Sequence, residues 1–331
     1  MIKIAPSILS ADFAELGRDI RRIATADYVH FDVMDGRFVP NITFGSGICK
    51  AAARGPLPVD AHLMVEHPET QVENFAQAGA KIITIHAEAE SQVTVLMDYA
   101  GEGEGQGLAA IQTKIYAEEG ALVRLVQVQR LPKGVTCLND VGGRCESGAK
   151  IEVTHLVLGG HATYQGCQID LAGHNSALET DIGYLLEAGS KLDMNYNAIH
   201  RGKKTTSRID ASGVLKEAAF KLFRGTIDFK HGSAGSVGNE KEDVLLLDDT
   251  AINQTIPLIL CAEEDVQGNH GATIGKLSEE TLAYMAARGI PEETAYELMA
   301  KARIHRVCER IPDEATRQLV EQELGGGNDD E

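Results

Sequence analysis

Two pairs of histidine and aspartate are spaced so that each pair would point to one face of a strand. His30 and Asp32 are two residues apart, as are Asp60 and His62, and alternate side chains of a strand share a face. Two imidazoles and a carboxylate suit a borderline divalent ion, so His30, Asp32 and His62 are candidate metal ligands. The alternative is that both histidines are hydrogen-bonded core residues, because isolated His-x-Asp pairs are common.

The first ninety residues predict the elements that would position these side chains. Short apolar runs at 4–9, 28–33, 59–64 and 81–86 predict buried parallel strands, and the stretches near 12–25, 45–54 and 69–79 predict helices. This alternation is typical of an α/β fold, in which the carboxyl ends of parallel strands carry the chemistry.

Charge and hydropathy exclude several classes of function. The chain of 331 residues has a net charge of -18 and 43% hydrophobic residues, which predicts a globular protein and argues against nucleic-acid binding. It has neither the features of a secretory signal nor an apolar run long enough to cross a membrane, so we expect a cytoplasmic location. The six dispersed cysteines form no Cys-x-x-Cys pair, which favours buried thiols over a disulfide framework.

The sequence after about residue 90 has a different character. Residues 100–107 are rich in glycine and predict a loop, and short alternating stretches follow at 121–128, 151–158, 178–185, 192–200 and 220–229. Glycines are expected to close most of these strands, at Gly142, Gly143, Gly159, Gly160, Gly173, Gly189, Gly202, Gly213 and Gly225. Such a pattern fits a sandwich, a barrel or a β-solenoid, of which we favour the solenoid. Ser278, Gly289, Pro291 and Pro312 predict three helices at the end.

The first ninety residues resemble the ribulose-phosphate 3-epimerase family. The similarity is carried by 5-APSILSAD-12, 30-HFDVMDG-36 with 39-VPN-41, and 60-DAHLM-64. The resemblance implies a TIM barrel in which Ser7 and His62 contact substrate and His30, Asp32 and His62 hold a divalent metal. It also implies that Asp32 is an acid/base residue and that Met34 and Met64 line the site.

The epimerase pattern is incomplete in this chain. The family takes a fourth ligand and second acid/base from a later aspartate, followed by glycine-rich phosphate loops, and Asp140 in 140-DVGG-143 is a coincidental match. Epimerisation beside a carbonyl needs an acid and a base on opposite faces, so we expect no epimerase activity. Four βα units also cannot close a barrel, and we expect unpaired strand edges that must dimerise or contact the rest of the chain.

Residues 91–324 resemble the SufB/SufD core family of iron–sulfur cluster assembly proteins. The similarity is carried by 216-KEAAFKLFRGTI-227, 244-VLLL-247, 251-AIN-253 and 262-AEEDVQGNHGATIG-275, and it extends into 277–290. The resemblance implies a right-handed parallel β-helix with a helical carboxyl-terminal domain. It also implies partnership with a SufC-like ATPase and a SufB-like protein, or a homodimer.

His270 is the candidate functional residue of this second part. It matches the histidine that the SufD branch places near the SufB interface, where cluster formation is implicated, and the alternative is an ordinary turn histidine. The family often has cysteine at the position of Gly268, so the resemblance favours a SufD-like scaffold that carries an iron–sulfur cluster transiently and with partners.

These two resemblances predict a mixed, chimera-like chain. We expect a partial barrel at 1–90, a β-helix at 91–276, a helical segment at 277–324 and a disordered tail at 325–331. The expected function is a non-catalytic scaffold, and the alternative is a metal-dependent epimerase. Whether the junction near residue 90 is natural stays open at this point.

Overall fold

The computed structural model describes residues 4–87, 89–101, 103 and 105–325. Its amino-terminal part has three strands, β1 (Val29–Met34), β2 (Val59–Met64) and β3 (Ala80–Ala87). Between them lie η1 (Phe13–Glu15), α1 (Leu16–Arg22), α2 (Ser46–Ala52), η2 (Pro68–Thr70) and α3 (Val72–Gln77). The α/β expectation is therefore confirmed for this part of the chain.

The strand expected at 4–9 does not form. Only an isolated parallel bridge joins Ser7 to His30 within the described residues, and Ile4 and Leu9 are exposed. Pro6 has no N–H with which to donate to a ladder, although its carbonyl accepts a hydrogen bond from the backbone N–H of His30. This segment crosses the edge of β1 as an extended loop.

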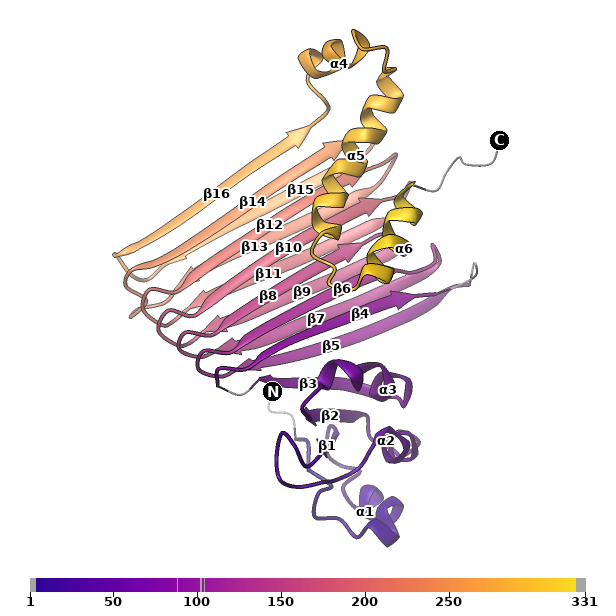
Figure 1. Cartoon of the computed structure of the whole chain (residues 1–331), viewed down its shortest axis with the longest axis vertical. Coiled ribbons are helices and arrows are strands. Elements are labelled where there is room, and N and C mark those ends of the chain that lie inside the picture. The colour runs from indigo at the N-terminus through magenta and orange to yellow at the C-terminus, as the bar shows by residue number, and fades with distance from the viewer. Residues whose placement is uncertain (1–3, 88, 102, 104, 326–331) are drawn as a thin grey trace.

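The rest of the chain is a solenoid of parallel strands (Figure 1). Strands β1 to β3 and the odd-numbered strands from β5 to β15 form one sheet, here called the long sheet, in the order β1-β2-β3-β5-β7-β9-β11-β13-β15. The even-numbered strands from β4 to β16 form the short sheet. The solenoid strands are β4 (Gln92–Ala100), β5 (Gly107–Ala117), β6 (Leu122–Arg130), β7 (Val135–Cys145), β8 (Lys150–Val157), β9 (Ala162–Leu171), β10 (Ala177–Leu186), β11 (Lys191–His200), β12 (Thr206–Leu215), β13 (Phe220–Phe229), β14 (Ser236–Leu246), β15 (Ile252–Cys261) and β16 (Val266–Gly275). The preference for a solenoid over a sandwich is confirmed.

Strand β3 belongs to both parts of the chain. It pairs in parallel with β2 on one side and with β5 on the other, where Ile83 is opposite Thr113 and Thr84 is opposite Lys114. One edge of the partial barrel is therefore covered by the solenoid itself. The incomplete barrel never closes and instead extends the long sheet.

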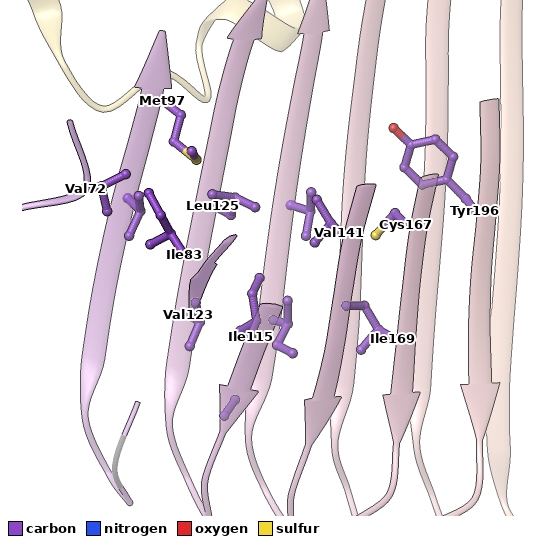
Figure 2. Packing of buried hydrophobic residues seen from close by; sticks show 14 of the residues in the cluster. Val72, Ile83, Met97, Ile115, Val123, Leu125, Val141, Cys167, Ile169 and Tyr196 are labelled. Atoms are coloured by element: carbon purple, nitrogen blue, oxygen red, sulfur yellow. The ribbon is translucent and has the colours of Figure 1, made fainter. Parts of the chain in front are cut away.

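The hydrophobic core is also continuous across this seam (Figure 2). Val72 of α3 and Ile83 of β3 belong to the same buried cluster as Met97 and Leu125 of the solenoid. Side chains that alternate along the strands fill the interior between the two sheets, as the solenoid pattern requires. The helical face of the barrel fragment therefore becomes the cap on the amino-terminal end of the solenoid.

Several of the expected turn glycines lie inside strands instead. Gly142, Gly213 and Gly225 are within β7, β12 and β13, whereas Gly159, Gly173, Gly189 and Gly202 lie between strands as expected. A Cβ at Gly213 would collide with the ring of the buried Tyr184. Close packing against Tyr184, its register partner on the neighbouring strand β10, explains that glycine, and turn conformation does not.

Three helices complete the fold: α4 (Glu279–Ala286), α5 (Glu292–Cys308) and α6 (Glu314–Gly325). The Ser278 hydroxyl accepts a hydrogen bond from the N–H of Thr281, which confirms it as the cap of α4. Helix α5 lies across the short sheet, where Ile304 and Val307 join a cluster with Leu156 (Figure 1). Residues 326–331 of the expected disordered tail lie outside the described residues.

No described strand caps the carboxyl-terminal end of the solenoid. Strands β15 and β16 are the last members of their sheets, and no further described strand pairs with either of them. Almost every residue of β16 is exposed, and four of the outward side chains of β15 are large and apolar: Ile252, Ile256, Leu258 and Leu260. Among the described residues no helix is long and apolar enough to cross a bilayer.

Candidate metal centre and the open end of the solenoid

The structure brings the three predicted ligands together on two neighbouring strands. His30 and Asp32 lie on β1, and register places Asp32 directly opposite His62 of β2. Asp32 Oδ1 is 3.2 Å from His30 Nε2 and 3.4 Å from His62 Nδ1. One ligand atom from each of the three residues lies within 4.8 Å of the others, so this donor set can converge on one divalent cation.

A second pair of side chains orients His30. Asp60 Oδ2 lies 2.9 Å from His30 Nδ1, and Thr84 donates a hydrogen bond of 3.3 Å to the other oxygen of Asp60. The hydrogen bond to Asp60 raises the pKa of His30, although partial burial opposes this. If Nδ1 carries the proton toward Asp60, the lone pair of Nε2 faces Asp32, which is the arrangement that metal-ligating histidines require.

Ser7 also lies at this cluster. Its hydroxyl donates a hydrogen bond to Asp32 Oδ2, and the Thr43 hydroxyl donates one of 2.6 Å to the Asp32 carbonyl. Met34 and Met64 are paired in register two residues beyond, and both are partly buried. The residues that the epimerase resemblance implies are therefore neighbours in space.

The cluster lies on the outer face of the long sheet. Register runs from Asp32 to His62, Thr84, Lys114 and Gly142 on successive strands. Lys114 is flanked by the fully buried Ile115 and nearly buried Thr113, so Lys114 points away from the interior. The side that would face the inside of a closed barrel is therefore open here.

Asp140 cannot complete the cluster in this arrangement. It lies on β7, three strands away from His62 in the order β2-β3-β5-β7. Neighbouring strands are about 4.8 Å apart, so these backbones are separated by about 14 Å. Although 140-DVGG-143 partly matches the family pattern, Asp140 is too far from His62 to be a ligand of the same metal ion.

Sequence reasoning missed the role of Asp60 and Thr84 in holding His30. The two-residue spacing in the sequence places Asp60 with His62 on one face of a strand. Its partner is instead His30, the residue opposite it on β1. A hydrogen bond between strands depends on register, for which the sequence gives no local signal.

The second predicted site residue, His270, lies on the last strand of the short sheet. Register pairs His270 of β16 with Glu240 of β14. Glu240 and Glu242 are buried whereas Lys241 between them is exposed, so position 240 and its partner 270 are on the interior side. His270 is exposed because no further rung covers it in the described chain.

A buried charged group lies in the interior of the last rungs, on β13 and β14. Lys221 of β13 is fully buried, pairs with Glu242 and donates a 3.2 Å hydrogen bond to Thr255. The Thr255 hydroxyl in turn donates a 2.6 Å hydrogen bond to Glu242. Glu240 is only 4% exposed, and burial together with the nearby Glu242 charge raises its pKa to about 7.

Comparison with known proteins finds similarity to two families, one in each part of the chain. The SufBD core domain of the SUF system for FeS cluster assembly matches residues 70–303, and the ribulose-phosphate 3 epimerase family matches residues 3–115. The first match covers most of the chain, so this protein belongs to the SufBD core family. The matches overlap at 70–115, the region that contains β3, where the structure joins the two folds.

Curated relatives match the amino-terminal part. The ribulose-phosphate 3-epimerases of Bacillus subtilis and Synechocystis are each 55% identical over 92 residues, or 27% and 26% of this chain. The chloroplastic ribulose-5-phosphate-3-epimerase of Arabidopsis thaliana is 47% identical over 95 residues, or 28% of this chain. The matches span 42%, 39% and 34% of these relatives, respectively. The chimera-like composition expected from the sequence is confirmed.

Proposed function

We propose that this protein is a cytoplasmic, SufD-like scaffold of iron–sulfur cluster assembly. The observation that carries the proposal is the SufBD core match, which spans β4 to β16 and reaches into α5. No step of catalysis is assigned to the scaffold. Its role is to present strand edges and side chains to a SufC-type ATPase and a SufB-type protein.

The uncapped end suits the SufB-type partner. Strands β15 and β16 present free backbone edges in the described structure, and such edges pair readily with a strand of another chain. The outward side chains of Ile256 and Leu258 are 46% and 44% exposed, which adds apolar surface beside that edge. A second copy of this chain is the alternative occupant.

The cysteines favour a cluster held only with partners. Five of the six thiols are buried, and burial raises the pKa of Cys145 and Cys167 to about 12, so both stay protonated. Cys261 at the end of β15 is exposed, but a cluster needs several ligands at once. Ligands from a partner at the uncapped end would supply the remainder.

A pull-down of the full chain against its cognate SufC-type ATPase and SufB-type protein tests the proposal. We expect both to bind, and the Ile256→Lys variant to lose the SufB-type partner while it retains the ATPase. Leu108→Lys, an exposed apolar position on β5, five strands away from β15 in the long sheet, is the matched control. If neither partner binds the unmodified chain, the proposal fails.

The amino-terminal cluster supports a second, narrower proposal: divalent-metal binding without epimerisation. Its residues would hold the metal through His30, Asp32 and His62, with Ser7 against Asp32. A bound metal would stabilise an enediolate, but a second acid/base aspartate has no counterpart in this chain. A coupled epimerase assay with added metal should show no turnover. Turnover that disappears in Asp32→Asn would overturn this proposal.

A further inference from the structure

A cavity of about 170 Å³ lies between helix α5 and the outer face of the short sheet. Its floor includes Asp181, Asp210 and Lys241, which register places side by side on β10, β12 and β14. The carboxyl-terminal end of α5 forms the opposite wall. A water molecule occupies about 30 Å³ in the liquid, so this cavity has room for a group of several heavy atoms.

The charges that line the cavity are not evenly paired. Each of the three carboxylates among the described lining residues has an arginine within 3.3 Å: Asp181 has Arg208 and Arg310, Asp210 has Arg208, and Asp243 has Arg303. Two cations of the lining, Lys241 and Arg306, have no carboxylate partner among the described residues. In a chain of net charge -18, two such cations that face one cavity indicate a site for an anion.

A buried hydroxyl lies beside these two cations. Ser212 is 5% exposed, and its Oγ accepts a 3.2 Å hydrogen bond from Arg306 Nη2. The hydroxyl has no acceptor for its own proton among the described residues, and a buried donor without an acceptor costs free energy. Ser212 is the register partner of Asp243, two residues after Lys241, so Ser212 and Lys241 are diagonal neighbours. Such positions are about 7–8 Å apart, so one small anion can contact both side chains.

The alternative is that Arg306 only complements the carboxyl-terminal end of α5, where basic side chains are favourable. That explanation covers the arginine alone. It does not account for Lys241, which is on β14, or for the unused proton of the Ser212 hydroxyl. An anion in the cavity accounts for all three groups.

We propose that Ser212, Lys241 and Arg306 bind a phosphate group between α5 and the short sheet. Guanidinium, ammonium and hydroxyl groups are the donors that phosphate oxygens accept from in proteins. Inorganic phosphate is the expected ligand, and the phosphate end of a nucleotide is the other source of the same chemistry. The site lies apart from the metal cluster on β1 and β2, and it does not depend on the proposed scaffold function.

Isothermal titration of the full chain with inorganic phosphate tests the site. The buffer contains EDTA, so that no metal at the amino-terminal cluster can bind phosphate. We expect saturable binding with a Kd of about 1 mM or tighter, and Ser212→Ala and Lys241→Gln should each weaken it by about tenfold or more. Lys203→Gln makes the same charge change at an exposed position between β11 and β12, and it should bind phosphate like the unmodified chain.

Melting temperatures supply the fold control. Lys241→Gln alters an exposed side chain, so without phosphate it should melt like the unmodified chain. Phosphate should raise the melting temperature of the unmodified chain and of Lys203→Gln, because a ligand of the folded state stabilises it. It should leave the melting temperatures of Ser212→Ala and Lys241→Gln nearly unchanged.

The outcomes separate the proposal from general attraction of anions. If Ser212→Ala and Lys241→Gln bind phosphate within about twofold of the unmodified chain, or if the unmodified chain shows no saturable binding, the proposed site is wrong. A parallel titration with ADP identifies the source of the phosphate group. Weaker binding of ADP than of phosphate supports the free anion, and tighter binding that the same two variants lose supports a nucleotide.

Discussion

Thr84 and Lys114 are paired neighbours on β3 and β5, which joins an epimerase-like strand to a SufBD-like strand within one sheet. This pair links the two parts of the chain. Thr84 donates a hydrogen bond to Asp60 beside the metal cluster, and Lys114 is paired with Gly142 of the solenoid. Strand β3 therefore takes the place of a barrel strand and of a first solenoid rung at once. Cleavage of the backbone near residue 90 would leave the pairing of β3 with β5 and the shared core in place.

We predict that the two parts unfold together. Ile83 is 7% exposed and packs in the core that crosses the seam, so Ile83→Ala should lower the free energy of unfolding by about 2–5 kcal/mol. Denaturant titration followed by far-ultraviolet circular dichroism should show a single transition in both proteins. Ile42→Ala is the control, because that side chain is 79% exposed and should change stability little.

Limited proteolysis checks the same prediction from another side. Even protection through residues 85–110 supports one cooperative unit, since the two folds share β3. A protected fragment near 91–324 would instead support the division at residue 90 and contradict the single transition. Two separate transitions for the unmodified chain would have the same meaning.

The alternation of polar and apolar residues predicts some strands of the solenoid but not others, for physical reasons. Strand β11 alternates polar and apolar residues from Lys191 to Ala198, with Leu192, Met194 and Tyr196 buried, and the sequence predicts it well. Strand β14 places Glu240 and Glu242 in the interior, so its charged residues lie on both faces and no alternation is visible. Strand β16 has few apolar residues and is held by backbone pairing to β14.

The sequence predicts the ligands of the candidate metal site, but it does not predict the face of the sheet on which they lie. The positions of His30, Asp32 and His62 follow from the two-residue period of a strand and from the family resemblance. That they lie on an open outer face follows from the pairing of β3 with β5, a contact between distant segments. Period and composition carry no signal for such register.

We predict that Asp60 positions the metal cluster through His30. Asp60→Asn removes the carboxylate charge that faces His30 Nδ1, and loss of such a supporting partner typically weakens metal binding about 10- to 100-fold. Titration with Co²⁺, followed by its visible absorption, measures this. Glu73→Gln, an exposed carboxylate on α3, is the control. Equal affinity in Asp60→Asn and the unmodified chain would show that the histidine orientation does not depend on Asp60.

We predict acid sensitivity from two buried histidines. Burial lowers the pKa of His155 to about 3 and of His200 to about 4, from 6.5. Both side chains stay neutral in the folded chain and take up a proton on unfolding at lower pH. Their contribution to stability is thus complete above pH 6.5 and is lost as pH falls toward these values.

The free energy of unfolding should therefore fall by about 1.4 kcal/mol per pH unit for each histidine between pH 6.5 and 4. Denaturant titrations at a series of pH values measure the slope. His200 is held by Thr205 and Ser207, so His200→Gln should fold and show a shallower slope than the unmodified chain. An unchanged slope would mean that His200 is not neutral in the folded protein.

We predict that two strand glycines respond in opposite ways to alanine. A Cβ at Gly213 would meet the ring of fully buried Tyr184, so Gly213→Ala must displace a core side chain and should cost about 1–3 kcal/mol or more. A Cβ built on Gly142 would have no other atom within 4 Å, and the φ angle of Gly142 is not positive. Gly142→Ala should therefore be neutral or stabilise the chain by up to about 1 kcal/mol, because alanine restricts the unfolded state.

Melting temperatures and denaturant midpoints of both glycine variants decide the matter. Both variants replace a glycine within a strand by alanine, and only Gly213 has a side chain, that of Tyr184, in the space that the methyl group would take. Gly213→Ala combined with Tyr184→Leu should recover part of the loss, since the smaller side chain frees the space that the methyl group needs. If Gly213→Ala were as stable as Gly142→Ala, the close approach between Gly213 and Tyr184 would not be a feature of the folded protein.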